Sequence, residues 1–77
     1  MMKEHDQVVL TKSIPSFGLE PGDVGVVIHV NRDGKAYEVE FTTLEGETIG
    51  VSTLEVTDVR AVGHTEVPHV RERLRAC

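Results

Sequence analysis

Apolar and polar residues alternate most regularly around one tight turn in the middle of the chain. Residues 24–30 are apolar apart from one glycine and one histidine, which indicates a β-strand with little polar surface. Residues 36–42 alternate completely, with three large apolar side chains on one side and Glu38 and Glu40 on the other. Between them, residues 31–35 contain an Asp-Gly pair, which tolerates the left-handed dihedrals of a hairpin turn. The pattern predicts a β-hairpin.

The alternation also predicts which side of the first hairpin strand packs in the core. We expect the side with four branched apolar residues to face inward: Val24, Val26, Ile28 and Val30. The opposite side carries Gly25, Val27 and His29 and is expected to face outward. Glycine inside a strand indicates a bulge, or a place where another segment crosses closely.

Shorter patterns predict the remaining elements. Residues 7–10 are an apolar run of strand type, and residues 48–52 and 59–62 are expected to be short strands. Residues 53–58 contain too few alternating positions for a strand and are expected to turn once as a 3₁₀ turn. Residues 11–21 carry three isolated apolar residues and two prolines, which predicts an ordered loop held on the core.

Two further turns are predicted from glycines. Glu20-Pro21-Gly22-Asp23 has the chemistry of a type II turn, because proline presets φ at the second position and glycine accepts a positive φ at the third. Gly46 is expected to have a positive φ in the turn over residues 43–47.

Five short strands, one long loop and tight turns predict an all-β fold, a small five-stranded SH3-like barrel over residues 7–62. Residues 63–77 are expected to form a C-terminal tail that is either flexible or holds one or two helical turns over residues 70–75. The expected core is a set of apolar residues from all strands: Val8, Leu10, Leu19, Val24, Val26, Ile28, Tyr37, Val39, Phe41, Ile49, Leu54 and Val62.

Composition narrows the class of protein. A chain of 77 residues forms one domain near the small end of what folds without crosslinks. The single cysteine, Cys77, cannot make an intramolecular disulfide. No apolar run approaches the roughly 20 residues needed to cross a bilayer, and the N-terminus has no hydrophobic signal core, so we expect a cytoplasmic protein with no membrane contact.

Catalytic and metal-binding chemistry have no clear carrier in the sequence. There is no Gly-x-Ser-x-Gly, no His-Glu-x-x-His and no phosphate-binding glycine loop. His64 and His69 lie five apart across Pro68, without the paired ligands of structural zinc sites. A barrel of this size is also filled by its own side chains. We therefore expect no enzyme activity, no cofactor and no bound metal.

A resemblance rests on several short motifs. They are Gly22-Asp23-Val24-Gly25-Val26-Val27, Ala36-Tyr37-Glu38-Val39-Glu40-Phe41, Gly46-Glu47-Thr48, Thr53-Leu54 and Val59-Arg60-Ala61-Val62. On these residues the chain resembles a small bacterial family of domains of unknown function, numbered 4926. Ala61 departs from the family pattern, which has a proline there. The Gly-Asp-x-Gly-x-Val strand also occurs in SH3-like modules of the KOW type, so the resemblance implies a fold rather than a function.

Binding to another protein is the function that requires least of these residues. A short five-stranded barrel has edge strands, which pair readily with another chain. We expect a non-enzymatic protein-interaction module that self-associates as a homo-oligomer or pairs with a co-encoded protein. The candidate surface combines the reverse face of the hairpin with the tail: Val27, His29, Glu38, Glu40, Arg71, Arg73 and Arg75. The tail arginines are opposite in sign to Glu38-x-Glu40 and Glu45-x-Glu47.

The alternative is a nucleic-acid or ribosome-associated SH3-like domain of the KOW type. The net charge of −5 disfavours it, because such binding depends on Lys and Arg that neutralise phosphates. Tyr37 and Phe41 are assigned to the core, which leaves no aromatic platform on which bases could stack.

Overall fold

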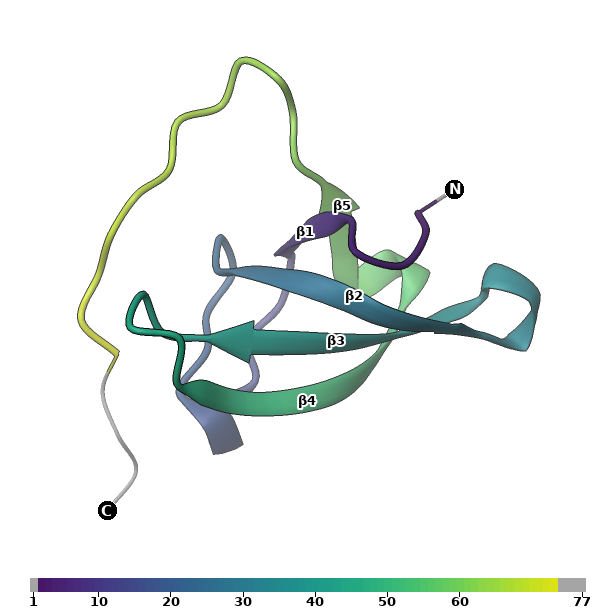
Figure 1. Cartoon of the computed structure of the whole chain (residues 1–77), viewed down its shortest axis with the longest axis horizontal. Coiled ribbons are helices and arrows are strands. Elements are labelled where there is room, and N and C mark those ends of the chain that lie inside the picture. The colour runs from purple at the N-terminus through teal and green to yellow at the C-terminus, as the bar shows by residue number, and fades with distance from the viewer. Residues whose placement is uncertain (1, 74–77) are drawn as a thin grey trace.

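One antiparallel sheet makes up the fold in the computed structural model, which describes residues 2–73. Its strands are β1 (Gln7–Leu10), β2 (Val24–Asn31), β3 (Ala36–Thr42), β4 (Thr48–Glu55) and β5 (Val59–Ala61). Their order across the sheet is β4-β3-β2-β1-β5 (Figure 1). The predicted all-β fold with five strands is therefore confirmed. β4 and β5 are the two edges and do not pair with each other, so the barrel is open between them.

Three short turns connect the strands: η1 (Pro15–Phe17), η2 (Arg32–Gly34), whose Asp33 is not helical, and η3 (Val56–Asp58). The first lies inside the predicted ordered loop, and the second is the predicted hairpin turn. The third is shorter than expected, because β4 continues to Glu55 instead of ending at Ser52. A capping box between Glu55 and Asp58 then closes η3, each side chain accepting from the other's backbone.

The backbone dihedrals explain the turn residues. Gly22 has φ of 100° and Gly46 has φ of 90°, as the two turn motifs predict. In the hairpin turn, Asp33 (φ 56°) and Gly34 (φ 87°) both lie in the left-handed region. The Asp-Gly pair is therefore needed for the shape of the backbone.

β3 supplies the centre of the core, as its alternation predicts. Tyr37, Val39 and Phe41 are each at most 2% exposed, and they pack with buried residues of every other strand. The buried core cluster is Val8, Leu10, Leu19, Val27, Tyr37, Val39, Phe41, Leu54 and Val59. Ile49 and Phe17 are partly buried against it. Phe41 and Leu10 are among the largest side chains that are fully buried.

The prediction for the faces of β2 is wrong. Val27 is fully buried, whereas Val24 is 46% exposed and Ile28 is 40% exposed. A shift in register between Val27 and His29 causes the difference: Val27 lies opposite Val39, and His29 lies opposite Glu38, so Ile28 is an extra residue. The bulge reverses the alternation of inward and outward residues. Of the four residues predicted to face inward, only Val30, which follows the bulge, packs on the core.

Other core predictions also need correction. Val26 is only partly buried, and Val62, which follows β5, is 38% exposed. Besides Val27, three residues that were not predicted are buried: Val9, Ala36 and Val59. Val9 is buried because the face of β1 opposite the core is also covered, a feature that no local pattern reveals.

The C-terminal segment forms no helix within the described residues. The helical turns predicted over residues 70–75 are absent from residues 70–73, and residues 74 and 75 lie outside the described range. After β5 the chain arches away and returns to the opposite side of the molecule (Figure 1). There Arg73 and Arg71 contact the loop that contains η1. We call residues 62–73 the strap.

Candidate functional site

β4 is bonded along one side only. It pairs with β3 from Thr48 opposite Thr42 to Glu55 opposite Ala36, and it has no strand on its other side. Among residues 2–73, none of the backbone hydrogen bonds formed outside the strand ladders involves residues 48–54. The backbone groups that point outward along this edge are therefore open to another chain.

The face of the sheet opposite the core carries a mixed row of side chains beside this edge. Val51 lies opposite Glu40, Glu40 lies opposite Val26, and Val26 lies opposite Gln7, so the row crosses four strands. Val51 is 44% exposed. The row therefore offers apolar surface next to a carboxylate.

Glu38 lies in a second row, between His29 of β2 and Thr53 of β4, and hydrogen bonds hold its carboxylate in place. Asn31 Nδ2 donates to Glu38 Oε2 at 2.6 Å, and Thr53 Oγ1 donates to the same carboxylate at 2.9 Å. In the neighbouring row, Thr48 Oγ1 donates to Glu40 at 3.2 Å. Both carboxylates of β3 are thus fixed by hydroxyl groups of β4, with their negative charge left on the surface beside the edge.

The structure separates the predicted interaction residues into three groups. His29, Glu38 and Glu40 lie on the face opposite the core, and His29 Nδ1 is 3.7 Å from Glu4 Oε2. Val27 was predicted to face outward, and this is wrong, because the bulge turns it into the core. Arg71 and Arg73 hydrogen-bond to the loop around η1 and line one groove together with Glu40, and Arg75 is outside the described residues.

Arg71 anchors the far end of the strap. Its Nε donates to Asp23 Oδ1 at 2.9 Å, and its Nη2 donates to Asp23 Oδ2 and, at 3.0 Å, to the Gly18 carbonyl. Burial raises the pKa of the Asp23 carboxyl. The hydrogen bonds from Arg71 and from the Glu20 N–H outweigh that effect, so its pKa lies below the ordinary value. The sequence suggested no such pair, because the two residues are 48 positions apart.

Arg60 anchors the near end of the strap. Its two Nη groups donate to the two oxygens of Glu66, at 2.8 and 2.6 Å, in a bidentate pair. These bonds, together with the Gly63 N–H, lower the pKa of Glu66 to about 2. Between the two anchors the strap is exposed, Val67 at 86% and Val70 at 73%.

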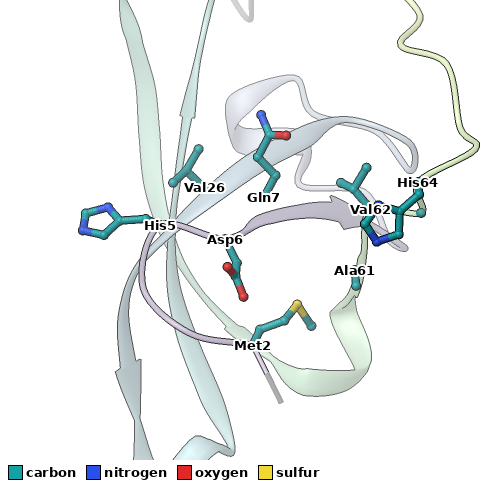
Figure 2. Close-up of a pocket in the computed structure, with 9 residues that line it drawn as sticks. Met2, His5, Asp6, Gln7, Val26, Ala61, Val62 and His64 are labelled. Atoms are coloured by element: carbon teal, nitrogen blue, oxygen red, sulfur yellow. The ribbon is translucent and has the colours of Figure 1, made fainter.

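Two hollows border the strap and the N-terminal segment. The larger is a groove of about 1040 Å³ whose walls include Val9, Val24 and Val26 of the sheet and residues 66–73 of the strap. The smaller one lies beside β1 and the start of the strap, and Figure 2 shows its lining residues. In it the His5 ring points away from the hollow and His64 lies at the opposite end, so the two imidazoles do not converge.

Residues 2–73 contain neither a cluster of metal ligands nor a membrane-spanning helix. Within residues 2–73, no three His, Cys, Asp or Glu side chains come together in a way that could hold a metal ion. No helix in that part of the chain is long and apolar enough to cross a membrane.

Comparison with known proteins gives one match. The family model for DUF4926, a domain of unknown function, matches residues 4–61. The chain belongs to the DUF4926 family. No curated protein and no solved structure matches it. The DUF4926 match ends at the last residue of β5, so the domain includes the β4 edge, Asp23 and Arg60, whereas the strap lies outside the matched residues.

Proposed function

We propose that this DUF4926 protein is a non-enzymatic protein-interaction module that accepts a partner strand along β4. The observation that carries the proposal is the chemistry of that edge. Residues 48–54 read Thr-Ile-Gly-Val-Ser-Thr-Leu, with no charged residue and no proline. Added strands gain affinity from main-chain hydrogen bonds, which any extended segment of a partner offers.

Most of this edge lacks protection, because the register shift of β4 is confined to Ile49 near its start and residues 50–54 pair with β3 without interruption. Natural sheets guard their edges with charged residues, prolines, bulges or very short strands. The opposite edge, β5, has only three residues. β4 has eight residues, and four of the seven in its uncharged stretch are β-branched and favour extended backbone. An open edge strand of this kind is expected where a partner strand binds.

The carboxylates beside the edge indicate the partner's charge. Glu38 and Glu40 lie opposite Thr53 and Val51 of β4, on the face away from the core. A strand bound to β4 can extend Lys or Arg side chains over these two positions to the carboxylates. A partner strand from a co-encoded or other protein should therefore carry basic residues at alternate positions.

The nucleic-acid alternative gains no support from these features. The face beside β4 is acidic, and Arg71 and Arg73 donate their hydrogen bonds within the chain. Nucleic-acid binding depends on free cationic groups placed to neutralise phosphates. These features favour a protein partner over a nucleic acid.

A capture experiment with a matched pair of variants tests the proposal. Val51→Lys places a charge on the β4 edge, whereas Val56→Lys makes the same change in η3 at similar exposure, 42% against 44%. We expect wild type and Val56→Lys to capture the same protein from a lysate, and Val51→Lys to lose it by tenfold or more. Equal capture by both variants, or capture of nucleic acid in place of protein, would contradict the proposal.

Self-association is the form of the proposal that needs no second gene product. Two copies pairing β4 with β4 would place uncharged residues opposite each other along the central stretch. Sedimentation at rising concentration should then show dimers for wild type and Val56→Lys but not for Val51→Lys. A wild-type chain that stays monomeric and also captures no protein contradicts the proposal in both forms.

A further inference from the structure

The strap is held by charge at its ends and by little else. Its valines are largely exposed, so burial of apolar surface does not fix it in place. It also lies beyond the residues that the DUF4926 family model matches. The contacts that hold it are those of Arg60 with Glu66 at one end, and of Arg71 and Arg73 with the η1 loop and Asp23 at the other.

The acceptors around Arg71 belong to the folded domain and are positioned independently of the strap. The Glu20 N–H donates to Asp23 Oδ2 at 2.8 Å and orients the carboxylate. Hydrogen bonds from the Leu10 N–H to the Asp23 carbonyl and from the Gly22 N–H to the Leu10 carbonyl fix the same turn to β1. The other acceptor is the carbonyl of Gly18, the residue that follows η1 and has a φ of 69°. These groups form a preorganised site for one guanidinium.

The geometry is that of arginine recognition rather than of a general cation site. Two adjacent nitrogens of Arg71 reach both oxygens of one carboxylate, a fork that lysine cannot reproduce. Glu20 Oε2 lies 3.8 Å from Nη1 and adds a second negative charge. Arg71 is 24% exposed and Asp23 is 19% exposed, so the pair is partly shielded from water.

The groove next to this site is covered by the strap but not filled by it. About 1040 Å³ remains between the strap and the sheet, where Val24 is still 46% exposed. A segment that lies deeper than the strap would bury this apolar surface while keeping the same charged contact.

We propose that Asp23, Glu20 and the Gly18 carbonyl form a binding site for an arginine of an extended protein segment, and that Arg71 of the strap occupies it in cis. The segment places its guanidinium where Arg71 now lies and its apolar side chains over Val24 in the groove. A tethered competitor has a high effective concentration, so the strap weakens binding of the free segment. This site is separate from the β4 edge, and either can exist without the other.

The test uses the full chain and a defined peptide probe. The peptide has the sequence of residues 66–73, Glu-Val-Pro-His-Val-Arg-Glu-Arg, with blocked ends. Arg71→Ala vacates the site in the protein. NMR titration should then show saturable shifts of the Gly18 and Asp23 amides. Affinity should be at least tenfold higher for Arg71→Ala than for wild type, in which the strap competes.

Substitutions in the peptide keep the protein intact and test the chemistry directly. Replacing the peptide's first arginine by alanine should weaken binding tenfold or more, and replacing it by lysine should weaken it to an intermediate degree. In the Arg71→Ala protein, Asp23→Asn should also reduce affinity, whereas Glu4→Gln, a carboxylate change beside His29 and outside the lining of the groove, should not.

Two outcomes would overturn the proposal. One is the absence of saturable shifts in Arg71→Ala up to millimolar peptide. The other is equal binding of the arginine and alanine peptides. Val51→Lys serves as the link to the proposed function: it should leave peptide affinity unchanged while it abolishes partner capture at β4. Failure of one site is thereby distinguished from failure of the other.

Discussion

Gly25 is the residue at which the packing of the sheet leaves least space. A Cβ atom there would lie 2.6 Å from Val39 Cγ1 and 2.7 Å from Phe41 Cε1. Both neighbours are buried core side chains with no room to move. The sequence pattern indicated either a bulge or a close crossing at this glycine, and the structure shows a close approach of side chains.

Gly25→Ala should therefore destabilise the fold by about 1–3 kcal/mol, the usual cost of overpacking a core. Chemical denaturation measures it. Gly63→Ala is the matched control, because its nearest neighbour, Glu66 Oε1 at 3.1 Å, is the end of an exposed side chain and not part of the core, and we expect a change within about 0.5 kcal/mol. Equal effects of the two substitutions would show that Gly25 is not closely packed.

At the scale of elements, the two hairpin strands show what the sequence can and cannot reveal. β3 begins and ends where its alternation predicts, Ala36–Thr42, because each inward residue packs on the core without interruption. β2 is apolar on both sides, so its sequence contains no signal for the bulge at Ile28. Which face is buried was decided by pairing with β3, a tertiary effect that the pattern of β2 alone cannot report.

The bulge makes adjacent residues of β2 energetically different. Val27→Ala should cost about 2 kcal/mol, from two buried methyl groups and the cavity they leave. Ile28→Ala removes more carbon atoms but from a side chain 40% exposed, and it should cost less than about 1 kcal/mol. Thermal or denaturant unfolding of the two variants gives the comparison. A larger destabilisation by Ile28→Ala than by Val27→Ala would contradict the bulge and favour the regular strand that the sequence predicts.

Contacts between distant segments set the limit of prediction for the candidate site. The unpaired β4 edge follows from strand order, and the sequence already predicted that a short barrel would have edges. The pairing of Arg71 with Asp23 joins residues 48 apart, and no spacing rule connects them. The sequence shows that the tail arginines and the carboxylates are opposite in sign, but not that Arg71 meets Asp23, because it gives charge without position.

At the scale of the whole molecule, acid should release the near end of the strap only near pH 2. The pKa of Glu66 is about 2, against an ordinary value of 4.5. The stability that the ionised Glu66 carboxylate gives to the near anchor of the strap is therefore complete above about pH 4.5 and is lost as the pH falls toward 2. The lowered pKa of Asp23 acts in the same direction at the other anchor.

NMR spectra recorded from pH 7 to pH 2 provide the measurement. The amides of Gly63 and Glu66 should shift with a midpoint near pH 2, and Arg60→Gln should move that midpoint upward toward 4.5, because it removes the bidentate donor. A wild-type midpoint near 4.5 would show that the near anchor does not form in solution.

The most direct test of the account is hydrogen exchange along β4, with and without the captured partner. In the isolated protein, the amides of residues 48–54 that point away from β3 should exchange rapidly, because no group in residues 2–73 accepts their hydrogen bonds. In the complex, exchange of these outward amides should slow by tenfold or more while β5 is unchanged. A partner that binds without slowing exchange in residues 48–54 would contradict the claim that β4 is the docking edge.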